Sequence, residues 1–183
     1  MPRHVAFLRA INVGGHVVKM DRLRRLFEGF GHSIANVETF IASGNVIFEA
    51  PSRNARALER AIAAGLGEAL GYEVATFIRS PTQLAAIRKY EPFPLRLRGA
   101  RTERDALYVG FLPEPPAPAA ARALRACGTE LEAFQVRGRE AYWLLRGRFS
   151  DSKFSGARLE KILGMPATLR NVTTVSKLAA KYA

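Results

Sequence analysis

Apolar and polar positions in the first half of the chain alternate between the period of a strand and the period of a helix. Residues 4–11 are apolar on both faces, as in a strand at the centre of a sheet. Leucines and phenylalanines recur at helical spacing between Asp21 and Phe30, and Gly31 ends that helix. The pattern predicts a strand over 4–11, a helix over 21–30, strands over 34–42 and 45–49, a helix over 53–70, a strand over 74–79 and a helix over 81–90.

The same order of elements returns in the second half. Residues 91–104, EPFPLRLRGARTER, hold two prolines, a glycine and four arginines without a period, which is typical of a connection. After it, the pattern predicts a strand over 106–112, a helix over 117–126, strands over 130–136 and 140–145, a helix over 153–163, a strand over 167–170 and a helix over 172–181.

Two local stretches indicate an internal duplication. LGYEVATFIRSPTQLAAIRKY (70–90) aligns with LGMPATLRNVTTVSKLAAKY (163–182). Both contain Leu-Gly, Ala-Thr, an arginine (Arg79 or Arg170), a capping residue and an amphipathic helix that ends near Lys-Tyr. The sequence therefore predicts an α+β fold of two tandem ferredoxin-like (βαββαβ, alpha-beta plait) units, each followed by an extra helix. The predicted limits are 1–91 for the first unit, 92–104 for the connection and 105–183 for the second unit.

This topology predicts which loops meet. In a βαββαβ unit the strands have the spatial order 4-1-3-2, and both crossover helices lie on one face of the sheet. The loop after the first strand and the turn between the second and third strands then open at the same end. We therefore expect residues 11–18 to lie beside residues 42–45, next to the turn at Gly71 and Tyr72.

That shared end is a candidate anion site, which we call the glycine rim. It comprises Asn12, Gly14, Gly15, His16, Ser43, Gly44 and Asn45, with Lys19 just before the first helix. Glycine allows close approach of the backbone, and a helix start offers free N–H groups and the positive end of the helix dipole. The alternative is that Gly14 and Gly15 only turn the chain, with Asn12 left-handed, since the pair lacks the spacing of a phosphate-binding loop.

Two arginines extend the candidate site. Arg9 lies inside the predicted first strand, where it must either be paired or face a ligand. Glu38, Glu49 or a backbone carbonyl would serve as a structural partner. Arg170 precedes a second helix start, where Asn171 and Thr174 could help to seat an oxyanion, although N-capping by Asn171 is the alternative.

The chain has a formal net charge of +12, which attracts phosphate polymers and anionic ligands. Arginine outnumbers lysine 22 to 6 and the basic residues are spread along the chain, so a compositional origin of the charge is the alternative. The sequence has no apolar run long enough to span a membrane, and its start lacks the zones of an export signal. We expect a cytoplasmic protein without a membrane partner.

Catalytic and metal-binding motifs are sparse. Cys127 is the only cysteine, and the three histidines are scattered, so we expect neither a metal site nor a cofactor. Residues 150–153, Ser-Asp-Ser-Lys, match an S-x-x-K pattern but lack the companion motifs of that enzyme class. Whether the protein is an enzyme stays open.

The stretches AFLRAINVGGHVVKMDRLRRLFEGFG, ETFIASGNVIFEA and LGMPATLRNVTTVSKL resemble the bacterial family known as domain of unknown function 1697. The resemblance covers nearly the full length, implies two tandem alpha-beta plaits and carries no established activity. Val172 departs from the tryptophan usual in the family. The recurring positions of the family fall here on Arg9, Asn12, Gly14, Gly15, Lys19, Met20, Leu23, Ser43, Gly44, Asn45, Arg170, Asn171 and Thr174.

Three functions follow from these patterns. The favoured one is a binding protein whose glycine rim holds a phosphate-bearing or other anionic ligand. Single-stranded nucleic acid is a weaker version, because GNVIFEA lacks the basic-aromatic signature of RNA-binding plaits. The alternatives are an enzyme with a site between the units and a structural or assembly protein. The predicted ligand-binding residues are Arg9, Asn12, Gly14, Gly15, Lys19, Ser43, Asn45, Arg170, Asn171 and Thr174.

Overall fold

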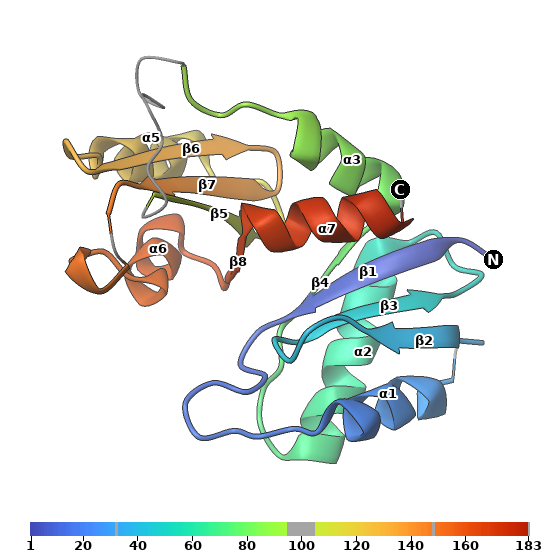
Figure 1. Ribbon diagram of the computed structural model, residues 1–183. Helices are drawn as coiled ribbons and strands as arrows, with labels where there is room; N and C mark the ends of the chain where they lie inside the picture. The colour runs from blue at the N-terminus through green and yellow to red at the C-terminus, as the bar shows by residue number, and fades with distance from the viewer. Residues whose placement is uncertain (32, 95–104, 148, 183) are drawn as a thin grey trace. The chain divides into compact units, whose positions relative to one another are not determined.

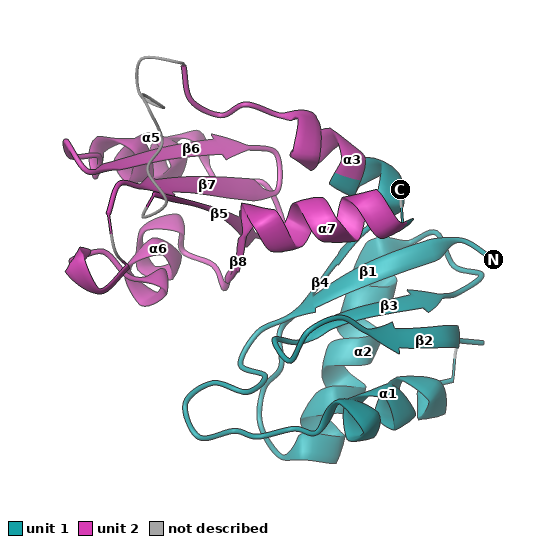
Figure 2. Cartoon of the chain, viewed as in Figure 1, with its two compact units in different colours: residues 1–84, 182–183 teal, residues 85–181 magenta. Residues whose placement is uncertain are grey.

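Each half of the chain is built around one four-stranded antiparallel sheet, in a mixed α+β architecture (Figure 1). The computed structural model describes residues 1–31, 33–94, 105–147 and 149–182. Unit 1 comprises Met1–Leu84 with Tyr182–Ala183, and unit 2 comprises Ala85–Lys181 (Figure 2). Most of the predicted connection, residues 95–104, lies outside the described residues.

The sheet of unit 1 has the strand order β2-β3-β1-β4, which is the order expected from the sequence. The helix α3 begins in this unit and passes into unit 2 after Leu84. Along the chain the elements are β1 (Arg3–Leu8), α1 (Met20–Gly29), β2 (Ala35–Thr39), β3 (Asn45–Glu49), α2 (Ala55–Leu70), β4 (Thr76–Arg79) and α3 (Pro81–Lys89).

The sheet of unit 2 has the equivalent order β6-β7-β5-β8. Its last helix, α7, ends at Tyr182, which belongs to unit 1. The elements are β5 (Ala106–Phe111), α5 (Pro118–Ala126), β6 (Glu132–Arg137), β7 (Glu140–Leu145), the 3₁₀ turn η1 (Phe149–Asp151), α6 (Gly156–Leu163), β8 (Thr168–Asn171) and α7 (Val172–Tyr182).

Both faces of strand β1 are buried, as its unbroken apolar sequence predicted. On one face, α1 buries Leu23 and Phe27, four residues apart and therefore on the same side of the helix. On the other face, Val5 and Phe7 are fully buried. The core that α1 and α2 form with their face of the sheet includes Ala6, Leu8, Leu23, Phe27, Val46, Phe48, Leu58, Ile62, Leu66 and Ile78.

Aromatic side chains dominate the core of unit 2. Trp143 on β7 is fully buried, and its indole contacts the rings of Phe134, Phe154, Phe149 and Tyr108 at centroid distances between 5.3 and 5.9 Å. The indole position is therefore fixed from several sides.

The two units share local features at corresponding positions. The Leu-Gly pairs end helices in both, with Gly71 at φ 79° and Gly164 at φ 69° in the left-handed C-cap conformation. In unit 1 Arg79 pairs with Val5 across the sheet, and in unit 2 Arg170 pairs with Val109.

Three predicted boundaries miss the observed ones by three residues each. β1 ends at Leu8, not at residue 11, because Ala10 turns left-handed at φ 63°. β2 covers Ala35–Thr39 rather than 34–42, because Ile41 is left-handed at φ 48°. α6 begins at Gly156, not at residue 153, because the Ser155 hydroxyl caps it by accepting the Arg158 N–H at 3.2 Å.

A buried ion pair joins α2 to the edge strand β4. The Glu59 carboxylate accepts the backbone N–H of Ile78 at 2.7 Å and lies 3.8 Å from Nη1 of Arg79. Both side chains are buried, Arg79 to the point that only 1% of its surface is exposed. Glu59 thus holds a strand amide and a buried guanidinium at once.

The end of the chain is tied to the first sheet. The Tyr182 hydroxyl donates to Oε2 of Glu38 at 2.7 Å, across 144 positions of sequence, and the Arg3 guanidinium lies over the Tyr182 ring. Hydrogen bonds from Asn36 and Arg3 lower the pKa of Glu49 on the neighbouring strand. Both carboxylates proposed as partners of Arg9, Glu38 and Glu49, therefore bind other groups.

Within the described residues, every helix is too short or too polar to cross a membrane.

Candidate functional site

The loop that follows β1 carries most of the predicted site residues. Arg9 is its first residue, half-buried, with its backbone N–H donating to the Ala75 carbonyl at 2.9 Å. The prediction that Arg9 lies inside a central strand was wrong. The strand has already ended, because Ala10 and Asn12 adopt left-handed conformations at φ 63° and 56°.

The glycine pair forms a tight turn. Gly14 and Gly15 have φ values of 62° and 88°, and the His16 N–H donates to the Val13 carbonyl at 3.2 Å across them. Two successive positive φ values define a type I′ turn, which favours glycine at both central positions. A Cβ atom at either glycine would meet nothing within 4 Å. The pair is thus required by the turn, as the alternative interpretation held, and it leaves the loop surface open.

Asn12 joins this loop to the β2–β3 turn. Its Oδ1 accepts the Val18 N–H at 2.7 Å, and its Nδ2 donates to the Ala42 carbonyl at 3.0 Å. The Leu8 N–H also donates to the Gly44 carbonyl at 2.8 Å. The expected meeting of these two segments, 30 positions apart in sequence, is therefore confirmed.

Asn45 and Ser43 shape the turn itself. Asn45 is fully buried, and its Nδ2 donates to the Phe40 carbonyl and to the Ser43 hydroxyl, both at 2.9 Å. Both amide hydrogens of Asn45 are therefore used inside the turn, where the sequence suggested a ligand contact. Gly44, at φ 73°, lies so close to Ile11 that a Cβ atom would come within 3.0 Å of the isoleucine Cβ.

An aromatic contact anchors the outer part of the loop. The His16 ring stacks on the Tyr72 ring at a centroid distance of 3.9 Å. Tyr72 belongs to the turn before β4, which was expected at this end, but its ring contact with His16 was not. Three β-branched side chains of the two segments that meet here are exposed, with 60% of Val13, 82% of Val17 and 56% of Ile41 accessible.

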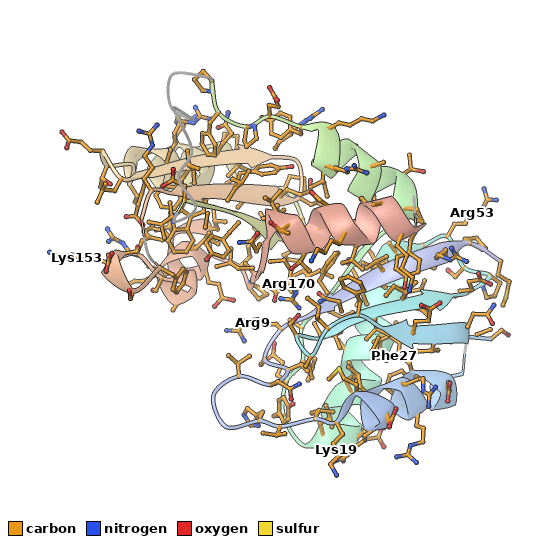
Figure 3. All side chains as sticks on the ribbon, in the orientation of Figure 1. Arg9, Lys19, Phe27, Arg53, Lys153 and Arg170 are labelled. Atoms are coloured by element: carbon orange, nitrogen blue, oxygen red, sulfur yellow. The ribbon has the colours of Figure 1, made fainter. Side chains whose placement is uncertain are left out.

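Lys19 lies at the start of α1 and projects into solvent there (Figure 3). It occupies the N-cap position, and the described side chains provide no cap for this helix. The first backbone N–H groups of α1 are therefore left for solvent or a ligand. In the first turn, Oδ1 of Asp21 lies 3.7 Å from Nη2 of Arg24, and such an exposed ion pair is weak.

Replacing Asn12 with alanine should lower the free energy of unfolding by about 1–3 kcal/mol, because two loop hydrogen bonds are lost and a left-handed residue acquires a less tolerant side chain. Urea denaturation measures the change. Asn12→Gly keeps the backbone conformation and should cost less. Equal losses in the two variants would show that the left-handed conformation contributes nothing and that the lost hydrogen bonds account for the whole effect.

The remaining predicted residues belong to unit 2. Arg170 is buried, and its Nη1 donates to the Thr168 hydroxyl at 2.8 Å and to the Leu169 carbonyl at 2.9 Å. Burial lowers the pKa of Arg170 to about 10. Asn171 accepts the Thr173 N–H at 2.9 Å, as an N-terminal cap of α7 would, and Thr174 is half-buried in the first turn. Arg170 and Asn171 thus form hydrogen bonds with other groups of the protein.

The fold and the loop define an α+β protein of two sheet units, the first of which carries a basic loop at one end of its sheet. The model of the family described as "Protein of unknown function (DUF1697)" matches residues 1–142, and the chain belongs to this family. Arg170, Asn171 and Thr174 lie beyond the matched residues.

A solved structure supports the fold. The chain is similar to the conserved bacterial protein SP0830 from Streptococcus pneumoniae, with a TM-score of 0.69 and 22% sequence identity. The similarity covers 100% of this chain and 98% of that one. No curated protein matched the sequence.

Proposed function

We propose that this protein binds a phosphate-bearing or other anionic ligand at the glycine rim of unit 1. The observation that carries the proposal is the start of α1, where Lys19 takes the N-cap position and no described side chain caps the helix. Free helix amides and the positive end of the dipole favour an anion at this point.

A basic side chain lies at each end of the loop that leads into α1. Lys19 is exposed beside them, and Arg9 is half-buried at the other end of the same loop. The Asn12 hydrogen bonds hold the loop in one conformation, so a ligand would meet a preorganised surface. We base the proposal on unit 1 alone, because Arg170 is buried and bonded to Thr168 and Leu169.

The exposed apolar side chains of the rim bear on the kind of anion. Val13, Val17 and Ile41, on the two segments that form the rim, keep more than half of their surface exposed. Clustered exposed apolar groups are typical of binding surfaces. They favour an anion that carries an apolar portion over a bare inorganic ion.

We also propose that the two units are ferredoxin-like copies of one ancestral unit. Their proposed limits are near 1–91 and 105–183. We propose further that the protein is cytoplasmic. The matching sheet orders and the equivalent cross-strand positions of Arg79 and Arg170 support the duplication. Both sheets are built from elements in the order βαββαβ, and this order supports the ferredoxin-like arrangement.

Titration of the isotope-labelled protein with phenyl phosphate, followed by amide NMR, tests the function. We expect saturable shifts at residues 12–22, because those amides and cations would surround the phosphate. The double variant Arg9→Ala with Lys19→Ala should weaken binding at least tenfold, since a hydrogen bond to a charged group contributes about 1.5–3 kcal/mol.

Arg146→Ala with Lys153→Ala is the matched control, because it removes the same charge from unit 2. Equal weakening in both double variants would mean that net charge, not the rim, attracts phosphate. An absence of shifts at residues 12–22 would refute the proposal. A short single-stranded oligonucleotide, titrated at two salt concentrations, separates the nucleic-acid version from the small-ligand one.

A further inference from the structure

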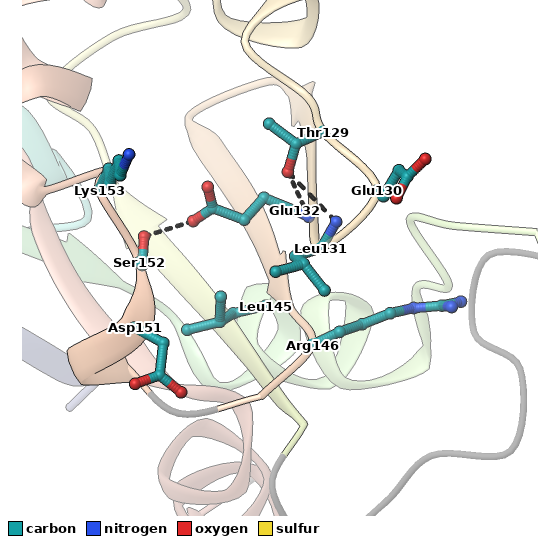
Figure 4. A pocket seen from close by; sticks show the side chains of 9 residues that line it. All are labelled: Thr129, Glu130, Leu131, Glu132, Leu145, Arg146, Asp151, Ser152 and Lys153. Carbon is teal, nitrogen blue, oxygen red and sulfur yellow. Dashed lines mark hydrogen bonds between the residues drawn. The ribbon is translucent and has the colours of Figure 1, made fainter.

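Unit 2 contains a cavity of about 400 Å³ between the start of β6, the end of β7 and the turn η1 (Figure 4). It shares no residue with the glycine rim, and nothing in the proposed function uses it. Its lining residues are Thr129, Glu130, Leu131, Glu132, Leu145, Arg146, Asp151, Ser152 and Lys153.

Two leucines give the cavity an apolar floor. Leu145 is buried, whereas 56% of Leu131 is exposed. Both line the cavity, and Leu145 pairs across the strands with Glu132, the residue after Leu131. A large apolar side chain left open at a cavity is typical of a surface that an organic ligand covers.

Glu132 is held in place above this floor. Its Oε1 accepts the indole N–H of Trp143 at 3.2 Å and the hydroxyl of Ser152 at 2.5 Å. The Thr129 hydroxyl accepts the backbone N–H groups of Leu131 and Glu132 at 3.2 and 3.1 Å, which fixes the start of the strand. Trp143 is itself locked by its aromatic neighbours. The carboxylate is therefore preorganised.

The second carboxylate oxygen of Glu132, Oε2, differs from Oε1 in its hydrogen bonding. Among the described residues, both hydrogen bonds to the carboxylate end on Oε1, and Oε2 accepts none. A carboxylate oxygen with a fixed position and open lone pairs is suited to receive a charged donor.

The charges around the cavity select the sign of the ligand. Glu132 and Asp151 supply carboxylates at its wall, and Asp151 is exposed. The side chain of Arg146 extends away from Glu132 (Figure 4), and Lys153 is exposed. The interior thus offers negative charge and apolar surface together.

We infer that this cavity binds an organic cation, in which an ammonium or guanidinium group meets Glu132 Oε2 and an apolar body covers Leu131 and Leu145. The Trp143 and Ser152 donors orient the carboxylate. The two leucines provide the apolar contact that a small inorganic cation could not use.

Benzylamine at pH 7 is a suitable probe, and benzyl alcohol is its neutral counterpart of similar shape. We expect saturable binding of benzylamine by calorimetry, with NMR shifts at Leu131, Glu132 and Ser152. Benzyl alcohol should bind at least tenfold more weakly, because a charge-assisted hydrogen bond contributes about 1.5–3 kcal/mol.

Glu132→Gln should reduce benzylamine binding to the level of benzyl alcohol, while its amide oxygen can still accept from Trp143 and Ser152. Glu114→Gln removes the same charge from an exposed position of unit 2 that does not line the cavity, and it should leave binding within about twofold. Leu131→Lys, at an exposed position that should not disturb folding, should also abolish binding by placing an ammonium at the cavity.

The inference fails if benzylamine does not saturate, if benzyl alcohol or benzoate binds as tightly, or if Glu132→Gln binds benzylamine like the wild type. Thermal melts of each variant show whether a loss of binding reflects unfolding. None of these outcomes depends on phosphate binding at the glycine rim.

Discussion

Replacing Glu59 with alanine is expected to lower the free energy of unfolding by about 3–5 kcal/mol, because it strips a partner from a buried charge. Glu59 binds the Ile78 N–H at 2.7 Å and faces Arg79, of which 1% is exposed. Without the carboxylate, the guanidinium stays in a poorly solvated place and a strand amide loses its acceptor. Urea denaturation followed by circular dichroism measures the loss.

Two further variants separate the causes. Glu59→Gln keeps an oxygen for the Ile78 amide and removes only the charge, so its loss should be smaller. Replacing both partners, Glu59→Leu with Arg79→Met, should recover most of the stability, since apolar residues of similar volume often replace a buried pair at little cost.

The exposed Glu68 on the same helix is the control. Glu68→Ala should change the free energy of unfolding by no more than about 0.5 kcal/mol. A Glu59→Ala loss as small as that of Glu68→Ala would show that Arg79 needs no carboxylate.

The order of elements could be predicted because each one leaves a local signal. The Leu-Gly pairs at Gly71 and Gly164 end their helices in a conformation that glycine adopts without steric cost, so the signal and its cause are the same residue. Gly44 and Gly138 likewise mark the two hairpin turns with positive φ values. Such signals do not depend on distant parts of the chain.

The end of β1 left no such signal. Ala10 and Ile11 continue the apolar run, and an alanine at φ 63° is not predictable from its own sequence. The turn is imposed by distant contacts, with Leu8 bonded to Gly44 and Asn12 to Ala42. The misplacement of Arg9 inside a strand follows directly from this.

Among the candidate ligand residues, too, some features could be predicted from the sequence and others depended on distant contacts. The topology correctly predicted that Asn12 lies next to the β2–β3 turn. The sequence could not reveal that Asn45 points into that turn and donates both amide hydrogens there. The Glu132 cavity had a usable signal. Register across the Gly138 turn pairs Phe134 with Trp143, which places Glu132 diagonally opposite the indole.

Replacing Gly44 with alanine should lower the free energy of unfolding by about 2–5 kcal/mol, through two separate effects. A side chain at φ 73° costs about 1–2 kcal/mol in the left-handed region. The new methyl group would also lie 3.0 Å from the Cβ of Ile11 and 3.2 Å from the Cβ of Leu8, both buried, and such overpacking costs about 1–3 kcal/mol. Urea denaturation gives the sum.

Gly14→Ala isolates the first effect. Gly14 has a similar φ of 62° but open space around its Cβ position, so this variant should lose only about 1–2 kcal/mol. The two variants should also differ by NMR, because the new methyl group would press on Leu8 and shift the Leu8 amide in Gly44→Ala alone. Equal losses in both variants would mean that the turn can move away from β1, and that the two segments of the glycine rim are joined less tightly than the Asn12 bonds indicate.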